Sequence, residues 1–146
     1  MPRGNHRARI DDKGRLKIPA AYKAFLDDPD GRGLYLTSIE GDSVLIYPMK
    51  NWLAVEERLS HAPSGHPSVR RFLTRVNYYG QDGEMDGQAR VLIPQLLRES
   101  ADMAGEVVVL GQRDYLEVWN HERFYAKLQR EPFTDDDYRA LAEFKF

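Results

Sequence analysis

The sequence predicts an α+β fold, rich in β-structure, in which two internal repeats complete one hydrophobic core. The main observation is a nine-residue pattern that occurs twice, DDKGRLKIP at residues 11–19 and DGQARVLIP at residues 86–94, at an offset of 75 residues. A second match follows at an offset of 72 residues, where Trp52 corresponds to Phe124. Two copies are too few and too long for a solenoid, so we expect a pseudo-twofold relation within one domain.

The length and composition of the chain suit one domain with a buried core. Of its 146 residues 42% are hydrophobic, whereas two separate domains of about 70 residues would each be marginal. The absence of cysteine excludes disulfides and thiolate metal sites and favours the cytoplasm. The N-terminal residues lack the apolar core of a signal peptide, and no stretch reaches the roughly 20 apolar residues of a membrane span. We therefore expect a cytoplasmic protein without membrane contact.

Each nine-residue pattern predicts a tight turn, then a strand, then a proline that begins a helix. In the first copy Gly14 supplies a positive φ, and the Asp11 carboxylate can accept turn N–H groups while it pairs with Arg15. We assign Asp86 the same structural role in the second copy. There Ala89 stands in place of the glycine, so a positive φ would strain the turn by about 1 kcal/mol.

The rest of the first half alternates strand and helix patterns with turn residues. The turn residues are dense in DDPDGRG at residues 27–33, and a polar IEGD follows at residues 39–42. Pro48 opens a helix that has Trp52 on its apolar face and ends at HAPSGHP. We expect strands at residues 7–10, 16–18, 34–38 and 43–47, a helix at residues 19–26 and another from residue 48.

The helix that begins at Pro67 connects the two halves. Its apolar residues follow the i, i+3, i+4, i+7 spacing of an amphipathic helix. The other side carries Arg70, Arg71 and Arg75, and an arginine-rich helix suggests binding in the DNA major groove. Its position in the connector instead favours a subunit interface or plain surface for Arg71 and Arg75, since arginine is enriched at protein interfaces.

The second half repeats the order of the first and adds a C-terminal extension. Asn120 predicts an N-cap for the helix that follows it, and Thr134 with Asp137 predicts a capping box for a last short helix. The side chains expected to face inward from that last helix are Tyr138, Leu141 and Ala142. The other expected elements are a hairpin at residues 83–93, a helix at 94–103 and strands at 106–111 and 115–119.

Several segments of the chain are typical of one protein family. They are Arg3 with Gly4, DDKGRLKIP, LIYPMKNW at residues 45–52, MDGQARVLIPQLLRESADM at residues 85–103 and EVVVLGQRDYLEVW at residues 106–119. Together they resemble the MraZ family, whose two halves are each related to the SpoVT/AbrB DNA-binding domain. The resemblance implies a swapped-hairpin, double-split β-barrel and ring-shaped oligomers. It also implies a bacterial transcription regulator that represses the division and cell-wall gene cluster including its own promoter.

The resemblance also sets the expected domain organisation. The repeats are SpoVT/AbrB-like, and residues beyond about 129 lie outside the resemblance. The expected boundaries are residues 5–51 for the first repeat, 52–80 for a helical connector, 81–124 for the second repeat and 125–146 for a C-terminal helical tail.

Charge is distributed unevenly along the chain. The formal net charge is −2, so the protein as a whole is not basic. Residues 1–23 nevertheless carry seven basic and two acidic side chains, whereas residues 131–146 carry two basic and five acidic ones. A local positive face can steer an anion even when the total charge is negative. The alternative is ordinary solvated surface charge.

Our hypothesis is that the first hairpin docks on double-stranded DNA, with most contacts to phosphate and a minority to base edges. Asp11, Gly14 and Asp86 are assigned to the turns, because a carboxylate that faces phosphate is repelled. Arg15 and Arg90 can be held by their aspartates and still present outer N–H groups to phosphate or guanine. The expected DNA-binding residues are Arg3, Arg7, Arg9, Lys13, Arg15, Lys17 and Arg90. A homo-oligomeric ring would place several hairpins along direct repeats of a promoter in the nucleoid.

Other classes of function have weaker support in the sequence. No nucleophile or histidine recurs in both motifs, so we expect no catalytic residue, no cofactor and no small-molecule substrate. His61 and His66 allow a zinc site only as an alternative interpretation, and no metal is expected. A structural or partner-binding module, either antitoxin-like or an assembly platform, is the rival hypothesis. Aromatic residues that recur in both halves predict core packing rather than base stacking, namely Tyr47, Trp52, Trp119 and Phe124.

Overall fold

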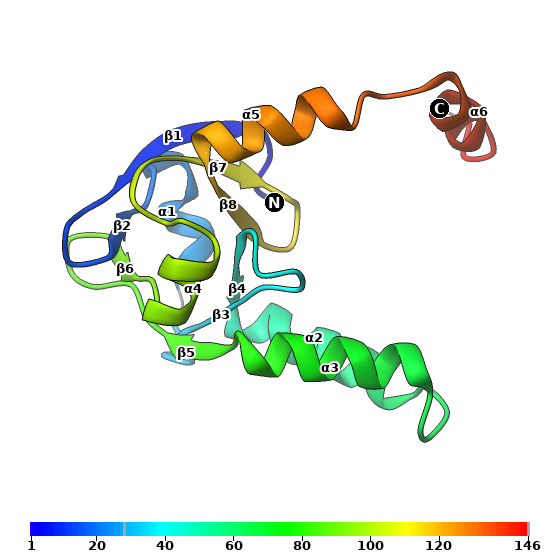
Figure 1. Cartoon of the computed structure of the whole chain (residues 1–146). Coiled ribbons are helices and arrows are strands. Elements are labelled where there is room, and N and C mark those ends of the chain that lie inside the picture. Colours follow the sequence, from blue (N-terminus) through cyan, green and yellow to red (C-terminus); the bar gives the residue numbers. More distant parts are fainter. Residues whose placement is uncertain (28, 146) are drawn as a thin grey trace.

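In the computed structural model, which describes residues 1–27 and 29–145, an eight-stranded antiparallel sheet curls into a nearly closed barrel (Figure 1). The strands are β1 (Asn5–Ile10), β2 (Arg15–Lys17), β3 (Leu34–Thr37), β4 (Val44–Pro48), β5 (Gln81–Gly83), β6 (Arg90–Leu92), β7 (Gly105–Gly111) and β8 (Leu116–Asn120). The helices are α1 (Ala20–Leu26), α2 (Met49–Ser60), α3 (Pro67–Tyr78), α4 (Gln95–Ser100), α5 (His121–Arg130) and α6 (Asp135–Ala142). The chain thus has the α+β fold with a shared core that the repeats predict, and the swapped-hairpin barrel that the family resemblance implies.

Pairs of strands from the two halves alternate in the sheet. The order β5-β3-β4-β8-β7-β1-β2-β6 places β1 of the first half against β7 of the second, and β5 of the second half against β3 of the first. All six residues of β1 pair with β7, whereas β1 meets β2 only at Ile10 and Leu16. The arms of the expected first hairpin therefore pair mainly with the other half of the chain.

The pairing registers show the pseudo-twofold relation directly. Between β2 and β6, Leu16 lies opposite Val91, and the flanking pairs exchange when 75 is added to the first-half numbers. Backbone hydrogen bonds obey the same relation. The N–H of Ile18 donates to the Ala89 carbonyl and the N–H of Ile93 donates to the Gly14 carbonyl, both at 2.9 Å. The two repeats are therefore joined symmetrically along β2 and β6.

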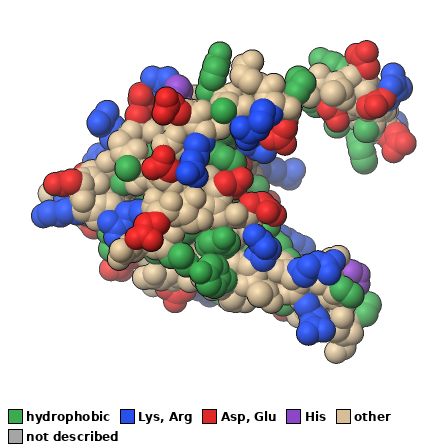
Figure 2. Space-filling model, in the orientation of Figure 1, with side chains coloured by type: hydrophobic (Ala, Val, Ile, Leu, Met, Phe, Trp, Pro, Cys, Tyr) green, Lys and Arg blue, Asp and Glu red, His purple; other side chains and the backbone are tan. Residues whose placement is uncertain are grey.

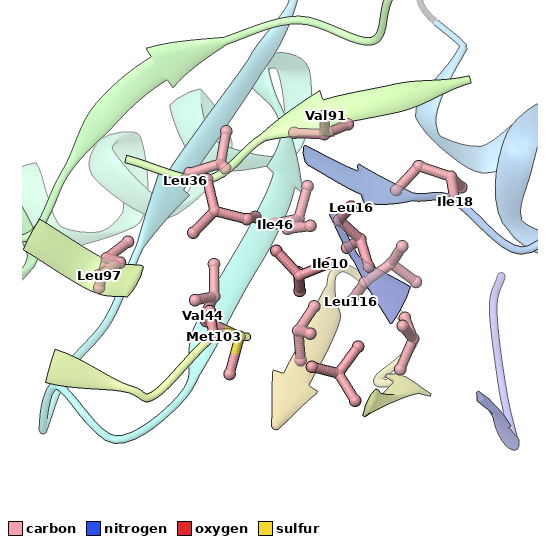
Figure 3. Packing of buried hydrophobic residues seen from close by; sticks show 14 of the residues in the cluster. Ile10, Leu16, Ile18, Leu36, Val44, Ile46, Val91, Leu97, Met103 and Leu116 are labelled. Carbon is pink, nitrogen blue, oxygen red and sulfur yellow. The ribbon is translucent and has the colours of Figure 1, made fainter. Parts of the chain in front are cut away.

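One hydrophobic core fills the barrel, and both halves contribute to it (Figure 3). Leu16 and its counterpart Val91 are fully buried, as are Val44 and its counterpart Leu116. Because neither half could cover these side chains alone, the interleaved sheet is what removes them from water. Each large buried aliphatic side chain of this kind stabilises the fold by roughly 1.5–3 kcal/mol.

A second apolar cluster attaches α2 and α3 to the outer side of β3 and β4. Trp52 is its centre, with ring centroids 4.6 Å from Tyr35, 5.0 Å from Tyr47 and 6.5 Å from Phe72. Burial raises the pKa of Tyr47 to about 12, because the phenolate would lose its hydration there. The expected core packing of Tyr47, Trp52 and Trp119 is confirmed.

The helix ends follow local chemistry. Asn120 caps α5 by accepting a hydrogen bond from the Arg123 N–H, and Thr134 forms the expected capping box with Asp137, so both predictions are confirmed. The helix expected to reach residue 103 ends at Ser100, because Asp102 adopts a left-handed conformation with φ 52°.

The inward orientation expected for α6 is wrong. Tyr138 is 57% exposed, Ala142 is exposed and Leu141 is only partly covered. The physical reason is the direction of α5, which carries the chain away from the barrel, so that α6 lies apart from the core (Figure 1). Among the residues that the structure describes, α6 has no apolar surface against which it packs.

Candidate functional site

The two DxxxR segments lie side by side at one end of the barrel, at the left in Figure 1. We call residues 11–15 the Asp11 turn and residues 86–90 the Asp86 turn. The pairing of β2 with β6 brings them together, although 75 residues separate them in sequence. Lys17 Nζ, just after the Asp11 turn, donates to the Gln88 carbonyl of the Asp86 turn at 2.5 Å. The site is therefore composite, with one turn from each half.

The Asp11 turn is built around its carboxylate. Asp11 Oδ1 accepts hydrogen bonds from the N–H groups of Lys13 at 3.0 Å and of Arg15 at 2.9 Å. Asp11 Oδ2 accepts from Arg15 Nε at 2.8 Å. These bonds, first of all the one from the Arg15 N–H, hold the pKa of Asp11 below its ordinary value. The aspartate is therefore ionised at neutral pH and fixes the arginine side chain.

The Asp86 turn has the same geometry. Asp86 Oδ1 accepts from the N–H groups of Gln88 at 2.8 Å and of Arg90 at 2.9 Å, and Asp86 Oδ2 accepts from Arg90 Nε at 3.0 Å. The pKa of Asp86 is also lowered, with the Arg90 N–H as the main cause. Ala89 has φ 60°, so this turn contains a non-glycine residue in the left-handed region.

The first turn has a neighbour that the sequence analysis missed. Gly14 has φ 83°, and a Cβ there would lie 2.5 Å from the side chain of Arg98 on α4. Arg98 thus lies directly over the Asp11 turn. The repeat offers a signal for it, because residue 98 corresponds to Lys23 at the offset of 75, so the same helical position is basic in both halves.

Arg15 and Arg90 face one shared hollow. Its volume is about 290 Å³, and its lining also includes Asp82, Glu84 and Asp86. The side chains of the two arginines are 29% and 28% exposed. Each uses Nε for its aspartate, and among the described residues neither terminal Nη pair has a protein partner. Two guanidinium edges held in this way can donate to a phosphate or to the acceptor edge of a base.

The other expected DNA-binding residues divide into two groups. Lys13 is exposed on the Asp11 turn, and Lys17 is exposed on β2, where its Nζ donates to the Gln88 carbonyl. Arg9 is exposed on β1. Arg7 is engaged elsewhere, because it donates to Glu106 at 2.9 Å and to His121 Nε2 at 2.6 Å.

Arg3 lies far from the turns. It precedes β1, whereas the Asp11 turn follows β1, and six strand residues span roughly 20 Å. Arg3 lines a separate hollow with Gly111 and Arg113. The structure therefore does not bring Arg3 together with the cations at the two turns.

Acidic and basic side chains alternate at the end of the barrel that carries the turns (Figure 2). Asp11 and Asp86 are compensated by N–H groups and arginines, but Asp12, Asp82 and Glu84 add negative charge nearby. The turns are therefore not part of a broad positive surface. Recognition here would depend on the fixed direction of a few N–H groups more than on long-range attraction.

The described residues offer no metal-binding cluster of three or more histidine, cysteine or acidic side chains. His61 lies 3.2 Å from Glu57, and His66 caps α3 by accepting from the Ser68 N–H. Their local partners leave the alternative zinc interpretation without a donor set. Among all the described residues, none of the helices has the length and apolar character needed to cross a bilayer.

Comparison with known proteins gives matches along nearly the whole chain. The family described as "MraZ protein, putative antitoxin-like" matches residues 1–75 and 81–144. A protein named transcriptional regulator MraZ from Acidobacterium capsulatum is 51% identical over 144 residues, 99% of each chain. One of the same name from Koribacter versatilis is 46% identical over 144 residues, 98% of each chain. Another from Chromobacterium violaceum is 37% identical over 115 residues, which cover 79% of this chain and 78% of the relative.

Proposed function

Because the chain belongs to the MraZ family, we propose that it is a transcriptional regulator that binds double-stranded DNA in a sequence-specific manner. In this proposal it acts in the cytoplasm at the nucleoid, as a repressor of the division and cell-wall gene cluster that includes its own promoter. Its action requires binding and no catalysis. The named relatives support regulation of transcription, and the two turns supply the surface.

The observation that carries the proposal is the pair of arginines in the shared hollow. Arg15 and Arg90 are each fixed through Nε by an aspartate, so their outer N–H groups have a defined direction before any ligand arrives. A guanidinium oriented in advance loses less conformational freedom on binding and can donate two hydrogen bonds to the O6 and N7 acceptors of guanine. Lys13 and Lys17 then add phosphate contacts on either side.

One chain offers few contacts, so we propose that a ring of identical subunits binds tandem direct repeats. A handful of phosphate contacts gives only weak, non-specific binding at physiological salt. Several copies held in one assembly raise the effective concentration of each turn at the next repeat. The affinity for DNA with several spaced repeats should therefore greatly exceed the affinity for DNA with a single repeat.

The test is a titration of fragments of the native promoter that contain one direct repeat or several. Binding is measured by fluorescence anisotropy at 50 to 200 mM salt. We expect the dissociation constant to rise steeply with salt, because bound phosphates release counterions. Arg15→Ala should weaken binding by about tenfold or more while the assembly keeps its mass. Arg15→Lys should keep most of the salt dependence and lose sequence discrimination, because lysine lacks the planar fork.

The matched control is Lys50→Ala, which removes an exposed cation on α2 away from the turns and should leave affinity unchanged. Binding that is indifferent to salt would rule out the phosphate contacts. Dissociation of the assembly in Arg15→Ala would instead show that this arginine has a structural role.

A second candidate function is a partner-binding module of the antitoxin or assembly-platform type. The acidic side chains interleaved with the cations at the two turns favour it, because they suit a protein surface better than a polyanion. In that case the wild-type assembly would fail to retain any promoter fragment, and one defined protein would bind at the turns. Loss of binding of that protein by the Arg15→Ala variant would locate its binding site at the turns.

A further inference from the structure

The C-terminal segment lacks cover within its own chain. No residue of α5 or α6 is fully buried, and the exposed aromatic side chains include Phe133 at 57%, Tyr138 at 57% and Phe144 at 78%. Phe133 and Tyr138 contact each other edge to face, with ring centroids 4.8 Å apart. A helix of eight residues is only marginally stable by itself in water. Its stability therefore calls for a surface that the described part of this chain does not provide.

The pseudo-twofold relation shows where a covering helix is lacking. After the first repeat, the connector helix α3 covers α2 through the stacking of Phe72 against Trp52. The counterpart of α2 is α5, in which Phe124 corresponds to Trp52. No helix of the described chain lies against α5 in this way, and Tyr125 is 61% and Leu128 53% exposed. Although α6 follows α5 as α3 follows α2, it does not lie against α5, so α6 lacks the contact that α3 makes (Figure 1).

The region that precedes and begins α6 is strongly acidic. Residues 131–137 contain four acidic side chains and no basic one. Asp137 is occupied in the capping box and Asp136 pairs with Arg139, whereas Asp135 has no partner among the described residues. Acidic side chains in the first turn of a helix interact favourably with the helix dipole, which explains why acidic residues occur here. The dipole does not account for the exposed aromatic pair beside them.

A complementary surface lies on α3. We define the arginine face of α3 as Pro67, Arg70, Arg71, Thr74 and Arg75, which line a hollow of about 380 Å³. Residues 61–80 contain no acidic side chain. Within the described chain Arg70 has no partner and Arg71 makes only a long 3.4 Å contact with Ser68 Oγ, while Arg75 donates to the Ile39 carbonyl at 2.5 Å. Two arginines are therefore free for an acidic ligand.

We infer that α6 of one copy docks on the arginine face of α3 in a second copy of this chain. Asp135 and Asp136 then face Arg70 and Arg71, and the Phe133–Tyr138 pair covers the apolar stems beside them. The contact joins two different surfaces, so it is head-to-tail and closes into a ring when the rotation permits. This inference rests on the ring of the proposed function and assigns its contact surface.

The experiment uses two charge-reversed variants of the full chain, Arg70→Glu/Arg71→Glu and Asp135→Lys/Asp136→Lys. Their masses are measured by light scattering after size exclusion, without DNA. Each variant alone should lose about tenfold or more in association constant, because like charges then meet at the contact. An equimolar mixture should regain the wild-type mass, because each reversed surface now finds a partner of opposite charge.

The control is Lys50→Glu/Arg58→Glu, which reverses two exposed cations on α2 and should leave the mass unchanged. Circular dichroism of each variant verifies that the fold is retained. Unchanged mass in both reversed variants would overturn the inference, and so would failure of the mixture to recover. Loss of DNA binding by Arg70→Glu/Arg71→Glu with an intact assembly would assign this face to DNA and also overturn it.

The two proposals can fail separately. If the wild-type ring forms and the charge reversals behave as expected, absence of promoter binding counts against the DNA-binding function alone. If the promoter is bound and the reversed variants keep full mass, the docking of α6 on α3 is wrong. A wild-type chain that stays monomeric contradicts both the docking and the ring.

Discussion

Gly14 and Ala89 occupy equivalent positions in the two turns but meet different neighbours. Both have positive φ, at 83° and 60°, and the left-handed conformation costs a residue with a Cβ roughly 1–2 kcal/mol. Above Gly14 lies the Arg98 side chain, so that a Cβ there would have to displace the end of that side chain. In the second turn Ala89 adopts its positive φ as a buried residue, with its Cβ in place. Replacement of glycine by alanine should therefore cost more in the first turn than it does in the second.

The reciprocal substitutions test this difference. Gly14→Ala should destabilise the protein by about 2 kcal/mol, from the strained φ and from displacement of Arg98. Ala89→Gly should change stability by less than about 0.5 kcal/mol, because relief of strain offsets the lost burial of a methyl group. Thermal unfolding of both variants measures the effect. Equal destabilisation by the two substitutions would show that Arg98 does not restrict the first turn.

Much of the turn chemistry can be read from the sequence. An aspartate followed four positions later by an arginine suggests a carboxylate that accepts turn N–H groups and pairs with a guanidinium, and both turns have this geometry. The contact of Lys17 with Gln88 and the position of Arg98 over Gly14 could not be read in this way. These contacts join segments 71 or more residues apart, and only the folded sheet brings them together.

At the scale of elements, Trp52 links α2 to the sheet and to α3. Trp52 is 3% exposed, and its ring contacts aromatic side chains from β3, β4 and α3. Local signals placed most helices and strands correctly, because prolines, capping residues and apolar periods act over a few residues. The orientation of α6 was predicted wrongly, since an apolar stripe shows that a helix needs cover but not which molecule supplies it.

Removal of the Trp52 ring should loosen this whole layer. Trp52→Ala is expected to destabilise the protein by about 3–5 kcal/mol, because a large buried ring leaves a cavity. Its neighbour Leu53 is 42% exposed, so Leu53→Ala should cost about 0.5 kcal/mol or less. Chemical denaturation of both variants gives the comparison. Similar costs for the two would contradict the linking role of Trp52.

At the scale of the whole molecule, the two halves are interdependent. After residue 64, a break in the chain would leave β1, β2 and β4 in one fragment and their partners β7, β6 and β8 in the other. The repeat predicts that two halves share a core, but the partner of each strand follows from long-range pairing. Periodicity along the chain carries no information on that pairing.

Fragments 1–64 and 65–146 test the interdependence. Neither should form a folded monomer, because each lacks the strands that cover its core residues, although either can pair with a second copy of itself. Mixing the two should restore a cooperative thermal transition and a sheet signal in circular dichroism. A folded monomeric fragment 1–64, verified by mass and by a cooperative melt, would show that the first half is an independent unit.

The interleaved sheet also constrains how the protein is made in the cell. As the ribosome releases the chain from its N-terminus, β1 emerges first but must wait for β7, and β4 must wait for β8, which ends at Asn120. Until then the nascent polypeptide displays unpaired strand edges that invite aggregation. Premature termination within the second half would therefore yield a product without a closed barrel. Such a product would be degraded by proteases and would not persist as a half-active protein.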